Sequence, residues 1–449
     1  MQPVHGGSLR EVSRAYLHIG ANKTGTSAIQ QFLARHSREL QQNGYCYPVT
    51  GRVGDAHYGI SRVLGFGAPA PASSGRVGLP RGMAAAWHRF ARGEPVARMR
   101  RRLEREFESS GCRYLVISSE HFVRTGDVGG VAALLAGFEV RVVVYLRRHD
   151  HWLLSSYNQA VRSVREPRWE LGADGYVRFR AAQLPGRGGY RLLLERWEAV
   201  FGREALLVRP YESEQNEGGV VADFLRTIGC MGLIDNACSE QHTVNVSLPP
   251  STTWLLDAIK RSGISPRMRT SLETRLIDGA RPGAARETLD FELRAELLRC
   301  NAGDYEYIAR HYMGRQDGRL FCEPDVPEQS WPHPDLAGAL GEFMAALDDK
   351  LDARETRRLG NRLRRAFALG RHTAPCESGR RAGEPSASGK APRTWRELLE
   401  RVPMRARTRA LLAARTADLD AALPGIVETI RMIVAALDGE DAMHGAWRA

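Results

Sequence analysis

The fold is decided by the stretch YLHIGANKTGTSAIQ, residues 16–30, which is typical of a strand, a tight turn and the start of a helix. Residues 16–19 are strand formers, and Gly20 and Gly25 bracket a turn of small residues. Backbone N–H groups at a helix N-terminus bind anions, of which phosphate is the usual one. The stretch therefore predicts a phosphate-binding loop between a strand and a helix.

The helix after this loop is expected to be capped by Thr26 or Ser27, because hydroxyl side chains accept hydrogen bonds from the first N–H groups. Its apolar residues recur at helical spacing, at Ile29, Phe32, Leu33 and Leu40.

Lys23 stands out in a chain that uses arginine almost everywhere. The only other lysines are Lys260, Lys350 and Lys390. A compact ammonium approaches a bridging oxygen as a point charge, which a planar guanidinium does less well. The loop is not a Walker A motif, in which the lysine follows the second glycine, because Lys23 precedes Gly25. No clear Walker B aspartate follows a later strand, so a magnesium-dependent NTPase is disfavoured.

Composition limits the class of protein. At 449 residues with a formal net charge of +12, the chain can bury a large core and favours anionic partners. The seven cysteines show no C-x-x-C spacing, so neither a zinc site nor a disulfide framework is expected. No apolar leader and no membrane span of about 18 residues is found. The expectation is a reduced, cytoplasmic protein.

Three further strands are predicted, at residues 113–118, 139–146 and 205–208, and helices separate them. Short apolar strands that alternate with helices indicate a parallel α/β sheet with helices on both faces. Ligands of such folds bind at the carboxyl ends of the strands. Polar candidates stand at four of these ends: Lys23, Glu120, Arg147 and Tyr211.

The rest of the chain is read as connections and helices. Residues 43–48 are expected to form a turn into a short extended piece, and residues 251–312 to be helical. Two segments that flank the predicted site, residues 51–81 and 163–187, are expected to shape an acceptor pocket. The helices after Leu369 are expected to pack on the rest of the chain, with dimer formation and binding of a partner as alternatives.

The segments GANKTGTS, SSEHF and YLRRHDHWLLSSYNQ, in this order, resemble the bacterial branch of the sulfotransferase family. The similarity runs from Tyr16 to about Phe321. It implies a phosphate-loop sulfotransferase fold and 3′-phosphoadenosine 5′-phosphosulfate (PAPS) as the sulfuryl donor, with no metal. The expected organisation is an N-terminal tail (1–14), a sulfotransferase domain (15–325), a helical extension (326–371), a flexible linker (372–392) and a helical C-terminal tail (393–449).

The resemblance also implies roles for single residues. Lys23 matches the lysine that contacts the phosphosulfate bridge, and residues 24–27 match the loop around the 5′-phosphate. Arg147 and Ser155 match the pair that binds the 3′-phosphate; Tyr157 sets this register over Arg148 and Ser156. The implied donor-binding residues are Gly20, Asn22, Lys23, Thr24, Gly25, Thr26, Ser27, Arg147, Ser155 and, where some members place an aromatic side chain near the nucleotide, Tyr211.

In-line sulfuryl transfer resembles phosphoryl transfer, in which positioning and charge stabilisation dominate. The attacking hydroxyl needs a base, and two candidates rank nearly equal. Glu120 follows a strand end, and His57 needs no large pKa shift to act near neutrality. His121 is expected to point away from Glu120 if strand geometry continues, and His18 to pack under the loop.

Three functions follow from these patterns. The first is a sulfotransferase that acts on a hydroxyl of a carbohydrate or glycosylated metabolite. The second is a kinase or NTPase. The third is a non-catalytic basic binding protein, although the chain lacks the interleaved basic and aromatic pattern of a nucleic-acid platform, so no nucleic acid is expected as a partner.

Overall fold

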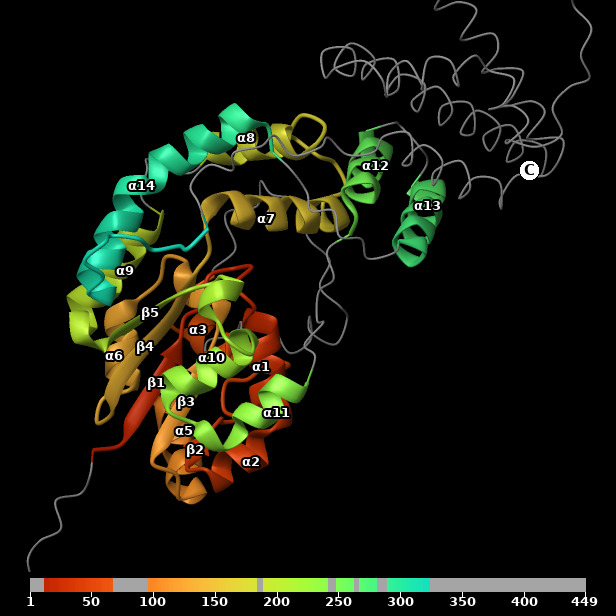
Figure 1. Ribbon diagram of the computed structural model, residues 1–449. Helices are drawn as coiled ribbons and strands as arrows, with labels where there is room; N and C mark the ends of the chain where they lie inside the picture. The colour runs from red at the N-terminus through yellow and green to blue at the C-terminus, as the bar shows by residue number, and fades with distance from the viewer. Residues whose placement is uncertain are drawn as a thin grey trace, which may run out of the picture. The chain divides into compact units, whose positions relative to one another are not determined.

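The computed structural model describes residues 12–67, 96–183, 189–240, 248–261, 266–280 and 289–323. Within these ranges the centre is a sheet of five parallel strands in the order β2-β3-β1-β4-β5 (Figure 1). The strands are β1 (Arg14–His18), β2 (Tyr45–Cys46), β3 (Tyr114–Ser118), β4 (Glu139–Leu146) and β5 (Leu206–Pro210). The predicted parallel α/β fold is confirmed, and β4 has the predicted bounds.

Each face of the sheet is covered by its own helices, as predicted (Figure 1). Side chains alternate along each strand, so Leu17 and Val142 belong to one core and Tyr16 and Val143 to the other. The first core takes side chains from α5 (Val96–Ser110), α6 (Val128–Leu134), α9 (Gly189–Phe201) and α14 (Phe291–Met313). The second takes them from α1 (Thr26–Arg35), α2 (Ser37–Gln42), α10 (Gly219–Ile228) and α11 (Ile234–Ser239).

The edge strand β2 lies within residues 43–48, which the sequence predicts only as a turn and a short extended segment. Tyr45 pairs with Tyr114 and Cys46 with Leu115. The Gly44 carbonyl accepts from the N–H of Arg113 at 3.1 Å and of Tyr114 at 3.0 Å, which continues the ladder. A strand of two residues shows no alternation in sequence, so its pairing is decided by β3.

The direction of the connections between strands reverses at β1. After β1 the chain goes to β2 on one side, whereas after β3 it crosses to β4 on the other side of β1. The helices that follow β1 and β3, α1 and α6, cover opposite faces of the sheet. Open α/β sheets bind ligands where the order reverses in this way. Residues 19–25 and 119–120 stand at the carboxyl ends of β1 and β3.

The single helix expected after the loop, with apolar residues from Ile29 to Leu40, is two helices. α1 ends at Arg35 and α2 begins at Ser37. Between them His36 has φ −96° and ψ 27°, outside helical values, and its ring packs on Phe32 at 4.3 Å between centroids. Leu40 is nevertheless buried, as its spacing predicts.

The chain divides into two compact units, and two of the boundaries between them fall within α7 (His149–Ser163) and α8 (Ala173–Gln183). The first unit holds the sheet, and the described part of the second comprises residues 157–179, 248–261, 266–280 and 289. Residues 15–325, expected as one domain, contribute to both. The remaining elements are α3 (Tyr58–Val63), α12 (Pro250–Arg261), α13 (Pro266–Gly279) and the 3-10 helices η1 (Glu120–Val123), η2 (Arg203–Ala205), η3 (Ser213–Gln215) and η4 (Met231–Leu233).

The second unit is organised around the buried carboxylate of Asp257 on α12. Its Oδ2 accepts from the Tyr157 hydroxyl at 3.1 Å, from Trp169 Nε1 at 3.0 Å and from the Gly172 N–H at 3.0 Å. A buried carboxylate needs such donors to offset its lost hydration. Asp257 therefore ties three separate positions of the chain to one helix.

Several expected segments lie outside the described residues. These are most of the tail 1–14, residues 68–81 of the acceptor-side segment, residues 184–187 and everything from residue 324 onward, including the helical extension, the linker and the C-terminal tail. In the part that the structure describes, no helix combines the length and apolar character needed to cross a membrane.

Candidate functional site

The loop between β1 and α1 is held in shape by its own side chains. The Ile19 N–H donates to the Val143 carbonyl at 3.0 Å and continues the sheet for one more residue. The Thr24 hydroxyl then donates to the Ala21 carbonyl at 2.6 Å, and the Thr26 hydroxyl reaches the same oxygen at 3.3 Å. Both threonines are buried, so these bonds close the loop from inside.

The predicted cap of α1 by Thr26 or Ser27 is wrong. The N-cap residue is Gly25, in the left-handed region at φ 73°, and no side chain accepts from the first turn. Thr26 already donates to the Ala21 carbonyl, and Ser27 is exposed. The first N–H groups of a helix need an acceptor, so an uncapped N-terminus at a strand end is well suited to an anion.

Two features of this loop restrict its sequence. Lys23 has φ 69°, and within the described chain it is the sole residue other than glycine at positive φ. A side chain costs roughly 1–2 kcal/mol in this region. A Cβ on Gly25 would lie 2.6 Å from Val220 Cγ1 and 3.1 Å from Tyr211 Cε2. The loop thus packs closely against the region after β5, and it keeps a lysine where glycine would be less strained.

Arg147 joins the ends of three strands. It follows β4, and its Nη1 donates to the Lys23 carbonyl at 2.9 Å. Its guanidinium lies 5.3 Å from the centroid of the Tyr211 ring, and the Tyr211 N–H donates to the Leu146 carbonyl. The Tyr190 hydroxyl, on α9, donates to the Arg147 carbonyl at 2.7 Å. The structure therefore brings together Lys23, Arg147 and Tyr211, which the sequence places at separate strand ends.

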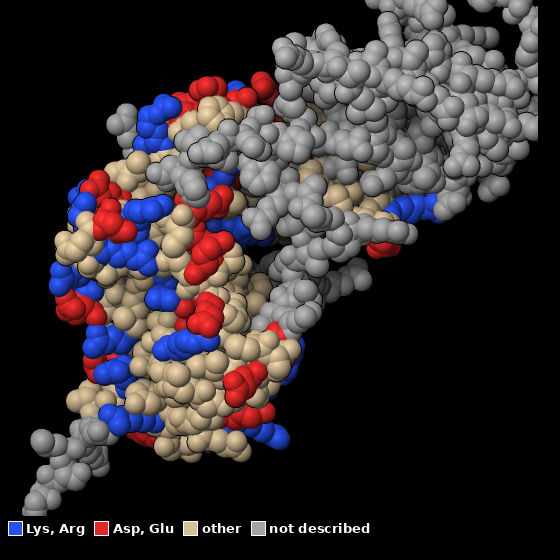
Figure 2. Space-filling view, in the orientation of Figure 1, with Lys and Arg blue, Asp and Glu red and all other residues tan. Residues whose placement is uncertain are grey.

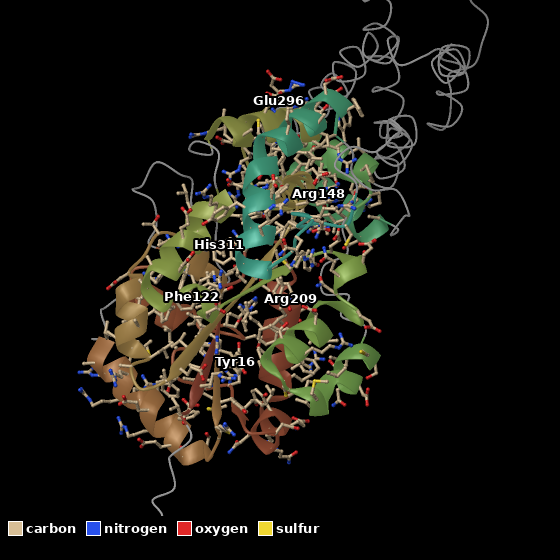
Figure 3. All side chains as sticks on the ribbon, turned by 60° about the vertical axis from the view of Figure 1, so that its left-hand side comes forward. Tyr16, Phe122, Arg148, Arg209, Glu296 and His311 are labelled. Atoms are coloured by element: carbon tan, nitrogen blue, oxygen red, sulfur yellow. The ribbon has the colours of Figure 1, made fainter. Side chains whose placement is uncertain are left out.

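The next residue, Arg148, is used elsewhere. It is 2% exposed and forms two hydrogen bonds with Asp150, at 2.9 and 2.8 Å. Arg148 lies near α14 (Figure 3). Arg294 on α14 bonds the same carboxylate, and Glu323 pairs with both arginines. Burial raises the pKa of Asp150, but hydrogen bonds from Arg148 and the nearby positive charges hold it well below its ordinary value. Arg148 is thus a structural residue, which favours Arg147 for ligand binding.

Ser155 and Ser156 differ as Arg147 and Arg148 do: the second residue of each pair is engaged within the fold. The Ser156 hydroxyl donates to the Trp152 carbonyl at 2.8 Å within α7. Ser155 is half-buried, and its hydroxyl has no partner among the described residues. Of the two serines, Ser155 is therefore the one whose hydroxyl can still bond a ligand. That Ser155 and Arg147 bind the same phosphate stays a prediction.

Glu120 begins the 3-10 helix η1 directly after β3. The N–H of the preceding Ser119 donates to the His18 carbonyl at 3.1 Å, so the end of β3 lies beside the start of the loop. The half-buried Glu120 carboxylate accepts a hydrogen bond from the Tyr58 hydroxyl at 3.2 Å on Oε1. Because η1 replaces strand geometry here, the alternation expected for His121 does not apply; its ring packs on that of Tyr58 at 4.6 Å.

His57, the second candidate base, is fully buried, and both of its ring nitrogens are engaged. Nδ1 accepts from the Ser118 N–H at 3.1 Å, and Nε2 lies 2.9 Å from the Pro48 carbonyl, to which it donates. Burial lowers the pKa of His57 to about 4. A neutral imidazole with no free nitrogen cannot accept a proton from a substrate, so the geometry argues against His57 as the base.

His18, Ser118 and Gln30 form a polar cluster under the loop that the sequence does not predict. His18 is fully buried, as expected, and its Nδ1 lies 2.8 Å from Ser118 Oγ. Gln30 Nε2 donates to the same hydroxyl at 3.1 Å, so β1, β3 and α1 are tied together here. Burial lowers the pKa of His18 to about 3, which keeps it neutral. The three residues lie 12 to 100 positions apart, so no local signal in the sequence links them.

No protein-family model matches the chain. A search of curated proteins finds an uncharacterized protein of Archaeoglobus fulgidus, 26% identical over 221 residues, which are 47% of this chain and 57% of that protein. Among solved structures, the crystal structure of a sulfotransferase from Alicyclobacillus acidocaldarius is similar at 20% identity and a TM-score of 0.29, over 48% of this chain and 81% of that chain. Neither likeness identifies a reaction or a site residue in this chain.

In the described ranges, no group of three or more His, Cys, Asp or Glu side chains is arranged to hold a metal ion.

Proposed function

We propose that this chain is a sulfotransferase that moves a sulfuryl group from PAPS to an acceptor hydroxyl. One observation carries the proposal: Arg147 donates to the Lys23 carbonyl and lies over Tyr211. A loop lysine, an uncapped helix N-terminus and an arginine beside an aromatic ring are groups that can bind a nucleotide with separate 5′- and 3′-phosphates. The sequence resemblance supports the same donor.

The residues of the site fit such a donor. The N–H groups at the start of α1 and the Lys23 ammonium suit the 5′-phosphate, since both favour negative charge. Arg147 supplies a planar fork, and Ser155 a hydroxyl, for the 3′-phosphate. Tyr211 offers a ring face at the third strand end. Gly20, Asn22 and residues 24–27 complete the loop as backbone donors.

The chain's own residues then carry out the transfer. The donor, when bound, supplies an activated sulfuryl group whose S–O bond to phosphate breaks as the new S–O bond to the acceptor forms. Lys23 holds the departing bridging oxygen and balances the charge that grows there. Glu120 takes the proton of the attacking hydroxyl. No step requires a metal ion.

The acceptor that we propose is a hydroxyl on a carbohydrate or glycosylated metabolite. The full chain should be incubated with ³⁵S-labelled PAPS and a panel of cell-derived glycans and lipids, and the products examined by mass spectrometry for added sulfate. Lys23→Ala should abolish transfer, whereas Lys23→Arg should retain part of it because the charge remains. Absence of labelled product, together with absence of binding to adenosine 3′,5′-bisphosphate, would overturn the proposal.

Two other functions are separated by simple controls. A kinase or NTPase would hydrolyse ATP in the presence of magnesium. A basic binding protein would bind DNA in a salt-dependent manner that Lys23→Ala leaves unchanged. On the face shown in Figure 2, basic and acidic side chains are interspersed over the described residues. This mixture gives no support to a polyanion-binding surface there.

A further inference from the structure

Tyr58 contacts the proposed base more directly than any other side chain described. Its hydroxyl donates to Glu120 Oε1 at 3.2 Å, and its ring packs against His121, the next residue of η1, at 4.6 Å between centroids. Burial, followed by the charge of Glu120, raises the pKa of Tyr58 well above its ordinary value. The hydroxyl therefore stays protonated at neutral pH and remains a donor to the carboxylate.

His57 explains why Tyr58 lies there. It is the residue before α3, and its backbone N–H donates to the Ser118 carbonyl at 2.8 Å while its Nδ1 accepts from the Ser118 N–H. These two bonds fix the start of α3 against the last residue of β3. Glu120 is two residues after Ser118. The two bonds between His57 and Ser118 therefore also set the distance between Tyr58 and Glu120.

The two oxygens of Glu120 are in different states. Oε1 is held by Tyr58, whereas Oε2 has no hydrogen-bond partner in the described part of the chain. A carboxylate with one oxygen fixed and the other unoccupied is oriented to accept a proton at the unoccupied oxygen. Without Tyr58, rotation of the side chain would exchange the two oxygens and spread them over several positions.

We propose that Tyr58 is a positioning residue for Glu120, and that His57 acts as the clamp that places it. This inference rests on the proposed sulfuryl transfer. In that reaction the acceptor O–H bond breaks and the acceptor oxygen bonds to sulfur. The proton goes to Glu120 Oε2, while Oε1 keeps the hydrogen bond from Tyr58. Tyr58 itself neither gains nor loses a proton.

The test is a double-mutant cycle of Tyr58→Phe and Glu120→Gln in the full chain. Labelled sulfate from PAPS is followed into a mixture of methyl glycosides, as simple hydroxyl acceptors, and into water. Phe keeps the ring on His121 and removes only the hydroxyl. Tyr58→Phe should lower kcat about tenfold, the loss expected for a hydrogen bond to a charged group, with an unchanged KM for PAPS. In the Glu120→Gln background it should have little further effect, because a residue that acts through another is not additive with it.

Tyr47→Phe is the matched control. Its hydroxyl donates to the Asp55 carbonyl at 2.6 Å in the same segment, and its ring meets His57 edge-on, but it does not contact Glu120. This variant should lose stability and keep kcat. If Tyr58→Phe lowers kcat as much in the Glu120→Gln background as in the wild type, or if it behaves as Tyr47→Phe does, the positioning role is wrong. If the wild type neither binds adenosine 3′,5′-bisphosphate nor releases sulfate from PAPS, the proposed function itself fails.

Discussion

Gly25 allows the construction of the loop to be tested with a matched pair of variants. Its φ is +73°, and an added Cβ would meet Val220 Cγ1 at 2.6 Å and Tyr211 Cε2 at 3.1 Å. Gly44 has a similar φ of +82°, yet a Cβ there would have no atom within 4 Å. Gly25→Ala therefore adds both backbone strain and a close contact, whereas Gly44→Ala adds strain alone.

The expected magnitudes follow from these two contributions. Gly44→Ala should lower the free energy of unfolding by about 1–2 kcal/mol, the cost of a side chain in the left-handed region. Gly25→Ala should lose about 1–3 kcal/mol more, because Val220 or the loop must move. The same movement displaces the N–H groups of α1, so binding of adenosine 3′,5′-bisphosphate should weaken about tenfold or more.

Denaturant unfolding and calorimetric titration measure the two effects separately. Gly44→Ala should bind adenosine 3′,5′-bisphosphate as the wild type does. Equal losses of stability in the two variants would show that the contact with Val220 is not tight. Unchanged nucleotide binding in Gly25→Ala would refute the claim that this loop forms the anion site.

Three further predictions concern the site and its support. Arg147→Gln should weaken binding of adenosine 3′,5′-bisphosphate about tenfold to a hundredfold and cost only about 1 kcal/mol of unfolding free energy, the contribution of one hydrogen bond. Arg148→Gln should instead cost about 3–5 kcal/mol of unfolding free energy by breaking a buried ion pair. If Arg148→Gln weakened nucleotide binding and Arg147→Gln lost stability instead, Arg148 would be the ligand-binding arginine and Arg147 the structural one. Lys23→Gly should abolish transfer while the unfolding free energy stays within about 1 kcal/mol of wild type, because glycine relieves the left-handed strain; a large loss would mean that the lysine stabilises the fold. The pKa of His57 lies at about 4 in the folded chain against 6.5 unfolded, so its contribution to stability is present above pH 6.5 and lost as the pH falls toward 4. His57→Gln should reduce the slope of unfolding free energy between pH 6 and 5 by about 1 kcal/mol per pH unit, and an unchanged slope would contradict a buried neutral histidine.

The elements with a strong local pattern could be predicted from sequence. β4 is eight consecutive residues with five apolar positions at its end, and its bounds agree with the prediction. Gly229 ends α10 in the left-handed region at φ 81°, as a helix-terminating glycine should. The meeting of Lys23, Arg147 and Tyr211 was also predictable, because parallel strands end at the same edge of a sheet.

Features decided by tertiary contacts could not be predicted. Ser27 and Thr26 are good capping residues, but the Thr26 hydroxyl is already bonded to the Ala21 carbonyl. His57 has the pattern of an exposed loop histidine, and only the nearness of Ser118 and Pro48 makes it a buried clamp. For the same reason the sequence does not indicate Tyr58, which lies 62 positions before Glu120, as its partner.

The central claim is that the loop and Arg147 bind two phosphates of one nucleotide. Calorimetric titration of the full chain with adenosine 3′,5′-bisphosphate and with adenosine 5′-monophosphate tests it most directly, since the two ligands differ by the 3′-phosphate alone. The bisphosphate should bind at least about tenfold more tightly, and Arg147→Gln should remove most of this difference. Equal affinity for the two nucleotides, or a preference that Arg147→Gln leaves intact, would contradict the account.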